Sequence, residues 1–214
     1  MRKVVIYGAS GHGKVIVDIV ERNRGEVFGF VDDDASKWGK LFFGYRVWGG
    51  EEYLKQLAKK EKISILIGIG DNHTRKEIKE KLDGENINFE TAIHPSTQIG
   101  KGVTIGEGTV VMPNSVINCD SRIGAHCIIN TTVTIDHDSI IGDFVHISPG
   151  ACLGGSVQVD SLSWIGLGAS VINNIHVAEQ SVVGAGAVVI RNVDPNTIVV
   201  GNPAEILKTN DTGG

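Results

Sequence analysis

The sequence predicts two domains of different classes: an α/β domain with a Rossmann-like parallel sheet over residues 1–88, and a solenoid of short β-strands over residues 89–214. In the first part, apolar strand segments alternate with helical segments, as in parallel sheets with crossover helices. In the second part, an aliphatic residue recurs at every sixth position. The charge balance changes at the same boundary, from net +2 (16 Lys and Arg against 14 Asp and Glu) to net −7 (4 against 11).

The six-residue repeat runs through the second part without an insertion. This period fits neither a helix of 3.6 residues per turn nor a single strand of period two. A triangular coil with one hexad per side explains it, and stacked coils would pair through parallel strands. The aliphatic positions, which we expect inside the coils, are Ile93, Ile99, Ile105, Val111, Ile117, Ile123, Ile129, Ile135, Ile141, Ile147, Leu153, Val159, Ile165, Val171, Val177, Val183 and Val189.

The same register predicts which residues share a column on neighbouring coils. Cys119, His137 and Gly155 are expected in one column, and His146 below Trp164 in another. No histidine of the repeat falls on an inward position. Four histidines are interpreted as surface or interface residues: His73, His94, His126 and His176.

Composition limits the function classes. Apolar residues make up 41% of the chain, which is enough for a core, and no run of eighteen apolar residues or signal-peptide pattern is present. We therefore expect a cytoplasmic protein without membrane insertion. The three cysteines show no CxxC spacing, so neither a disulfide framework nor a zinc knuckle is predicted. With four cations in residues 89–214, a nucleic-acid surface is not expected there.

In the first part, the segment KVVIY predicts a buried strand, followed by a glycine turn and a helix over 12–24. VFGFVDDD predicts a second strand, residues 50–62 a second helix, SILIGIG a third strand, and a third helix ends near Leu82. Ligands of parallel sheets bind beyond the carboxyl ends of the strands. The turns GASGHG, VDDD and GIGDN all lie at those ends.

The glycine turn GASGHGKV (8–15) resembles two phosphate-binding loops and matches neither. Val15 replaces the hydroxyl residue of a P-loop, and Ser10 replaces the middle glycine of a dinucleotide fingerprint. Glycines still allow close approach of a phosphate to a helix N-terminus. Asp32 stands where dinucleotide enzymes read a ribose. We predict nucleotide binding; the alternative is a turn that only packs the helix on the strand.

Several motifs occur together in order: YGASGHGKV, VDDD, IGIGDN, the hexad repeat, IDHD, FVHISPGA and GNPA. In this combination almost the whole chain resembles the bacterial hexapeptide-repeat sugar acyltransferases, a family that includes sialic acid O-acetyltransferases and UDP-4-amino-sugar N-acetyltransferases. The resemblance implies a left-handed parallel β-helix and a homotrimer. It also implies acetyl-CoA as co-substrate, without a metal, and a UDP-linked amino sugar as acceptor in bacterial glycan biosynthesis.

The resemblance also assigns roles in the first domain, where the nucleotide would bind. It places the glycine turn at the diphosphate, the second strand's carboxylates at the uridine, and the third turn in the same cleft. The implied substrate-binding residues are Ser10, Gly11, His12, Asp32, Asp33, Gly70 and Arg75.

In the second domain the resemblance implies that His137 is the general base, that Asp138 orients it, and that the Gly155 N–H stabilises the oxyanion. Imidazole suits this role because it titrates near neutral pH. Direct transfer is expected, with Cys119 the one thiol near the predicted site. The other implied contacts are Asn118 for the acceptor, and His146, Ser148, Gly155, Leu167 and Ala185 for CoA.

Two departures from the family pattern stand out. Glu205 follows GNPA where Lys or Arg is usual, so contacts to the CoA phosphates are left to Arg191 or Lys208 or are weaker. The segment VDSLSW (159–164) lacks a usual hexad glycine.

Three alternatives remain open. The acceptor can be a hydroxyl of sialic acid or another sugar, since the same base serves both. A zinc enzyme with three histidine ligands would need a His-x-x-x-x-His pair, which the repeat lacks. A non-catalytic sugar-nucleotide-binding scaffold would not need the His137–Asp138 pair. The sequence does not specify the sugar or the pathway.

Overall fold

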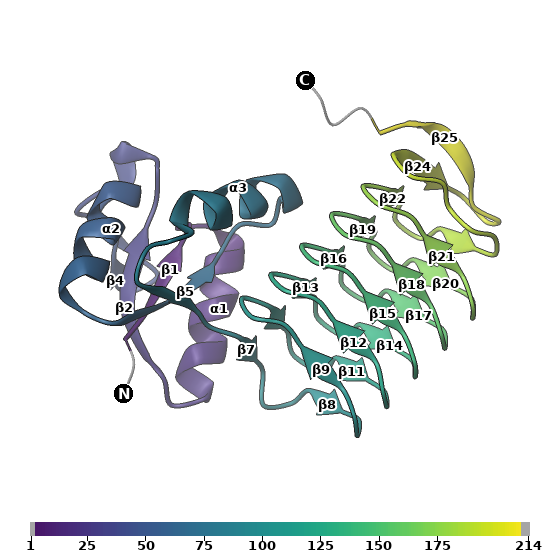
Figure 1. The fold of residues 1–214 in the computed structure, drawn as a ribbon, viewed down its shortest axis with the longest axis horizontal. Coiled ribbons are helices and arrows are strands. Elements are labelled where there is room, and N and C mark those ends of the chain that lie inside the picture. The colour runs from purple at the N-terminus through teal and green to yellow at the C-terminus, as the bar shows by residue number, and fades with distance from the viewer. Residues whose placement is uncertain (1–2, 211–214) are drawn as a thin grey trace. The chain divides into compact units, whose positions relative to one another are not determined.

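The computed structural model describes residues 3–210, and the chain divides into two compact units between Pro95 and Ser96 (Figure 1). The sequence predicted this boundary after residue 88. The short strand β6 (Ile87–Phe89) pairs in parallel with β5 (Ile63–Ile67), so the chain completes the first sheet before it leaves the first unit.

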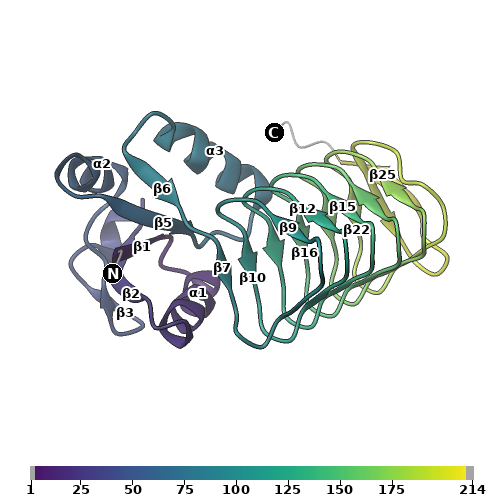
Figure 2. The ribbon, with the colours of Figure 1, turned by 60° about the horizontal axis from the view of Figure 1, so that its bottom comes forward.

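The first unit is a parallel four-stranded sheet in the order β2-β1-β5-β6. Its other strands are β1 (Lys3–Tyr7) and β2 (Glu26–Val31), and its helices are α1 (Gly11–Arg22), α2 (Glu51–Lys60) and α3 (Asn72–Leu82). Alternate strand residues point to opposite faces. Val5 and Ile65 pack with α2 and α3 on one face. Helix α1 covers the other face (Figure 2), and its residues Gly13 and Ile16 are buried.

The three helices and three strands predicted for this unit are confirmed within a few residues of their ends. Four short elements were not predicted: the 3₁₀ turn η1 (Ala35–Lys37), the strands β3 (Leu41–Phe42) and β4 (Tyr45–Arg46), and β6. Strands of two or three residues are too short to show a period, so no pattern indicates them.

The second unit is a parallel β-helix of about six turns with the architecture of the left-handed class, as predicted. Up to the last coil, strands pair in parallel with the strand one coil further on, for example Ile128 with His146 and His146 with Trp164. The strands are β7 (Ala92–Ile93, in the first unit), β8 (Gln98–Ile99), β9 (Thr104–Ile105), β10 (Val110–Val111), β11 (Val116–Ile117), β12 (Arg122–Ile123), β13 (Ile128–Ile129), β14 (Thr134–Ile135), β15 (Ile140–Ile141), β16 (His146–Ile147), β17 (Cys152–Leu153), β18 (Gln158–Val159), β19 (Trp164–Ile165), β20 (Ser170–Val171), β21 (His176–Val177), β22 (Val182–Val183), β23 (Val188–Val189), β24 (Thr197–Val200) and β25 (Glu205–Thr209).

The aliphatic hexad positions fill the coil interior, as residues such as Ile135, Ile147 and Ile165 are fully buried. Ile99 is an exception at 43% exposure, because β8 is the terminal strand of its face. At the other end, β24 and the antiparallel β25 follow the last complete coil. Within residues 3–210, no helix is both long and apolar enough to span a membrane.

Candidate active site

His137 lies at a coil corner with its side chain 56% exposed. Its Nδ1 is 2.7 Å from Asp138 Oδ2, and Asp138 adopts the left-handed conformation (φ 58°) that the corner requires. A carboxylate only accepts hydrogen bonds, so this contact assigns the ring proton to Nδ1. Nε2 is therefore the nitrogen that is available to take a proton, as expected of a general base.

A second carboxylate at this corner was not singled out from the sequence. Asp136 Oδ1 accepts hydrogen bonds from Asn118 Nδ2 (2.8 Å) and from the His137 N–H (2.9 Å). These two donors lower the pKa of Asp136. The residue is the first acid of IDHD, and its place in that motif is the one sequence signal that points to it. Asn118 therefore contacts the histidine corner through Asp136.

The pKa of His137 is raised above its ordinary value, first by the hydrogen bond to Asp138 and then by the negative charge of Asp136. A raised pKa makes the neutral imidazole a stronger base. The two aspartates thus favour proton uptake at Nε2.

This geometry predicts a shift in the pH profile of an Asp138→Asn variant. The general base works when neutral, so kcat should rise with pH through the pKa of His137. Losing the Asp138 carboxylate lowers that pKa, and the acidic limb should move to lower pH while the plateau falls on the order of tenfold. Initial rates measured from pH 5 to 9 test this. An unchanged limb would show that Asp138 does not set the basicity of the group that titrates.

Gly155 lies directly against the His137 ring, as the eighteen-residue register predicted. It is buried, and a Cβ at this position would stand 2.8 Å from both Cε1 and Nε2 of His137. Only glycine leaves room for the imidazole here. Within residues 3–210, the Gly155 N–H donates to no protein acceptor. A backbone donor beside the base nitrogen is the arrangement expected of an oxyanion site.

His146 and Ser148 belong to one connected group. His146 Nε2 lies 3.2 Å from Asn130 Nδ2, and its ring stacks on Trp164 at 5.4 Å. Trp164 Nε1 donates to Ser148 Oγ at 2.7 Å. From the sequence, His146 and Ser148 were named separately, Trp164 was placed only in the column of His146, and Asn130 was missed. No pattern links residues sixteen positions apart across two coils.

The remaining residues named for CoA lie further along the β-helix. Leu167 and Ala185 are exposed on their coil corners. Arg191 Nη1 forms an ion pair with Glu205 at 3.3 Å, with both side chains exposed. The charge of Glu205, the unusual acid after GNPA, is therefore paired with that of Arg191, one of the two cations named for the CoA phosphates.

The glycine turn of the first unit has two kinds of glycine. A Cβ at Gly8 would stand 2.6 Å from Ile69 Cδ1, and a Cβ at Gly13 would stand 3.0 Å from Phe30 Cε1, so both are packing positions. Gly11 has open space at its Cβ position. Ser10 is the N-cap of α1 and donates its hydroxyl to Gly68 O at 2.6 Å. The packing alternative therefore explains Gly8 and Gly13 but not Gly11.

The predicted uridine carboxylates already have partners within the chain. Asp32 is buried and accepts hydrogen bonds from Ala9 N and Asp34 N, at 2.8 and 2.9 Å. Asp33 is exposed and accepts from the Tyr7 hydroxyl at 2.7 Å; burial of the phenol and this bond raise the pKa of Tyr7. His12, which was assigned to the diphosphate, is half-buried in the first turn of α1.

The turn after β5 is held by Arg75. Its side chain is buried, with Nη1 2.8 Å from Gly70 O and Nη2 2.9 Å from Asn72 Oδ1. Gly70 has open space at its Cβ position. The structure thus places Arg75 as support for the turn that presents Gly70, and its direct contact with substrate stays a prediction.

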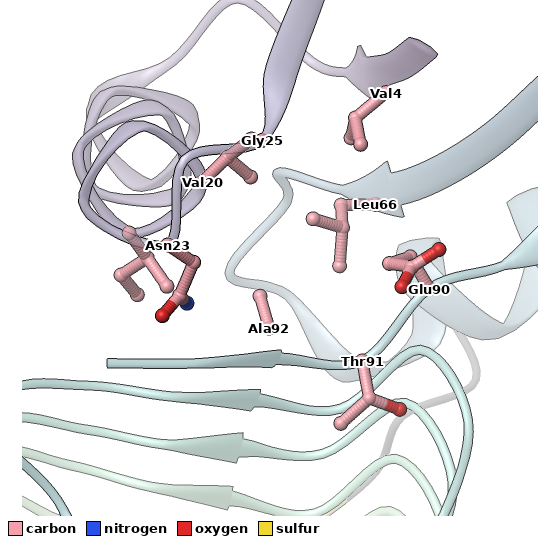
Figure 3. A pocket seen from close by; sticks show the side chains of 9 residues that line it. Val4, Val20, Asn23, Gly25, Leu66, Glu90, Thr91 and Ala92 are labelled. Atoms are coloured by element: carbon pink, nitrogen blue, oxygen red, sulfur yellow. The ribbon is translucent and has the colours of Figure 1, made fainter. Parts of the chain in front are cut away.

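Two of the cavities among the described residues of the first unit differ in their lining. One of about 410 Å³ is lined by Asp33 and by the aromatic residues Trp38, Trp48 and Tyr53. The other, of about 210 Å³, is lined by Val4 and Leu66 among others (Figure 3). None of the residues predicted to bind substrate lines the smaller cavity.

The interpretation of His94 and His126 as surface or interface residues is wrong, because both side chains are buried within the chain itself. His126 stacks on Phe144 at 5.1 Å, one coil further on, and Gly108 leaves space for its ring on the coil before. Corner side chains can thus stack along the coil axis. Among the described residues, no group of three or more His, Cys, Asp or Glu side chains is arranged to hold a metal.

A β-helix with a carboxylate-bound histidine and a glycine N–H at one corner defines a hexapeptide-repeat acyltransferase. Residues 3–82 match the PglD N-terminal domain family. The solved structure of PerB from Caulobacter crescentus, in complex with CoA and GDP-perosamine, is 34% identical with a TM-score of 0.91, covering 96% of this chain and 97% of that one. The chain belongs to the family of bacterial sugar N-acetyltransferases with this N-terminal domain.

Other relatives agree with this assignment. The acetyltransferase domain of PglB from Neisseria gonorrhoeae is 33% identical with a TM-score of 0.89, covering 97% of this chain and 100% of that one, and another structure of it contains acetyl coenzyme A. A curated relative, the UDP-N-acetylbacillosamine N-acetyltransferase of Bacillus subtilis, is 40% identical over 113 residues. That match spans 51% of this chain and 51% of the relative.

Proposed function

We propose that the protein transfers an acetyl group from acetyl-CoA to the 4-amino group of a UDP-linked deoxy-amino sugar in bacterial glycan biosynthesis. The observation that carries this proposal is the corner at His137, where Asp138 holds Nδ1 and Gly155 packs against Nε2. The name of the Bacillus subtilis relative supports a UDP-linked acceptor, and the PerB complex supports a nucleotide-linked amino sugar in general.

The reaction needs one base and one oxyanion donor. The neutral amine of the sugar attacks the thioester carbonyl, and His137 Nε2 takes the proton that the nitrogen loses. The Gly155 N–H stabilises the oxyanion of the tetrahedral intermediate. Collapse breaks the carbon–sulfur bond, and the sulfur of CoA leaves as a thiol with the proton from His137. The products are the N-acetyl sugar and CoA, without an acyl-enzyme.

Two groups of residues would bind the substrates. Acetyl-CoA would contact the His146 and Ser148 group and extend past Leu167 and Ala185 on the coils. The nucleotide would lie at the carboxyl ends of β1, β2 and β5, where Gly11 and Gly70 leave open space.

We further propose that the chain forms a homotrimer. Support comes from large apolar side chains on the coil surface, since Ile140, Leu167 and Ile172 are 47%, 58% and 45% exposed. Apolar surfaces of this kind are commonly buried between subunits. A closed threefold assembly would bury them at each of its three subunit interfaces.

The acceptor is tested by thiol release from acetyl-CoA with a panel of UDP-4-amino sugars and free sialic acid. Release with a UDP-amino sugar, with an amide product identified by NMR, supports the proposal. Release with sialic acid alone would establish O-acetylation instead. No release with any acceptor, from protein that binds the panel members, would favour a non-catalytic scaffold.

A further inference from the structure

Lys37 lies at the glycine turn, in the 3₁₀ turn η1, which was not predicted from the sequence. Its Nζ is 2.8 Å from Asp32 Oδ2 and 3.4 Å from the carbonyl oxygen of Ala9, the residue that precedes Ser10. The Lys37 side chain is 39% exposed, whereas that of Asp32 is 11% exposed. The carboxylate is therefore inside, and the ammonium group lies between it and solvent.

Asp32 has its carboxylate engaged by its own chain. Oδ2 accepts from Ala9 N and Lys37 Nζ, and Oδ1 accepts from Asp34 N. A carboxylate with three such donors is poorly placed to read ribose hydroxyls, which are also donors. The geometry of Asp32 suits a structural role, because the carboxylate ties the glycine turn, the end of β2 and the ammonium of Lys37 together.

The local charge gives Lys37 a role at this edge of the sheet. The segment Asp32–Asp34 places three carboxylates at the end of β2, beside the glycine turn where the family resemblance puts the diphosphate, and like charges repel. An ammonium group has three donors. Two of them meet Asp32 and Ala9, which leaves one for a ligand at the turn.

Another lysine near the turn is held differently. Lys14, in the first turns of α1, has its Nζ 5.2 Å from the centre of the Phe42 ring, a cation–π contact with the β3–β4 hairpin. Lys37 is the one held by the turn itself.

We propose that Lys37 binds the diphosphate of the nucleotide-linked sugar, and that Asp32 is a positioning residue that holds Lys37 against the glycine turn. This inference rests on the proposed function, because it takes the nucleotide to bind at this turn. It names an additional binding residue for the phosphates.

The test compares UDP with uridine by titration calorimetry, for the wild type, Lys37→Met and Lys37→Arg. Lys40→Met is the matched control, since Lys40 is an exposed lysine on the same loop. Loss of a charge-assisted contact should weaken UDP binding by about tenfold or more in Lys37→Met. Uridine binding should change less than about twofold, and Lys37→Arg should recover part of the UDP affinity.

Melting temperature separates this role from a structural one. If Lys37 only balances Asp32, Lys37→Met should melt at lower temperature and lose affinity for UDP and uridine in equal proportion, which would overturn the inference. Unchanged UDP binding in Lys37→Met would overturn it as well. A wild type that binds neither compound would instead overturn the proposed function, and the assignment of Lys37 with it.

Discussion

Replacement of His137 by alanine is expected to lower kcat by about 10²–10⁴-fold, the usual loss when a general base is removed. The sugar nitrogen must lose a proton as the amide forms, and His137 Nε2 is the acceptor that the corner presents. The KM for acetyl-CoA should change little, because the residues assigned to CoA, apart from Gly155, lie on other columns. Steady-state thiol release with saturating acceptor measures both constants.

His176→Ala is the matched control for this variant. His176 also pairs with a carboxylate, with Nε2 2.7 Å from Asp160 Oδ2, and its side chain is 42% exposed. It should keep wild-type kcat. If His137→Ala stayed within about threefold of the wild type, His137 would not be the base, and a scaffold role or another base would have to explain the corner.

Gly155→Ala is expected to lower kcat by about 100-fold while the protein stays folded. The added Cβ would stand 2.8 Å from the imidazole, so the ring must turn away from its position, and small misplacements of a reacting group carry losses of this size. The clash falls on the end of a side chain that can move, and so the melting temperature should remain near that of the wild type. Thermal unfolding and kcat together test this.

The His137→Ala background provides the control for Gly155→Ala. If the added methyl acts by displacing the imidazole, the double variant should have nearly the same kcat as His137→Ala, because no imidazole is left to displace. Additive losses in the double variant would show that the methyl disturbs something other than His137, such as the direction of the Gly155 N–H.

The β-helix could be predicted in detail because each coil repeats one local rule. The register placed Gly155 above His137 without any knowledge of tertiary structure. In the first unit, the helices and the strands β1, β2 and β5 could be predicted from their apolar patterns. Burial of His126 could not, because it results from stacking between corners of two coils.

Contacts between distant segments explain the rest of what was missed. Asn130 meets His146 and Trp164 meets Ser148 only after the coils stack. The partners of Asp32 come from the glycine turn and from η1, and no motif links them. The VDDD motif predicted a ligand site, but it did not indicate that the carboxylate of Asp32 already accepts hydrogen bonds from its own chain.

Direct transfer is tested most sharply by a single-turnover experiment with acetyl-labelled acetyl-CoA, rapidly mixed with a stoichiometric amount of enzyme. Cys119, an exposed free thiol in the column of His137, is the nucleophile that an acyl-enzyme route would use. The proposed mechanism predicts no thiol release and no label on the protein until the amino sugar is added, and then release in step with product. A burst of thiol without acceptor, with label on the protein that disappears in Cys119→Ala, would contradict it.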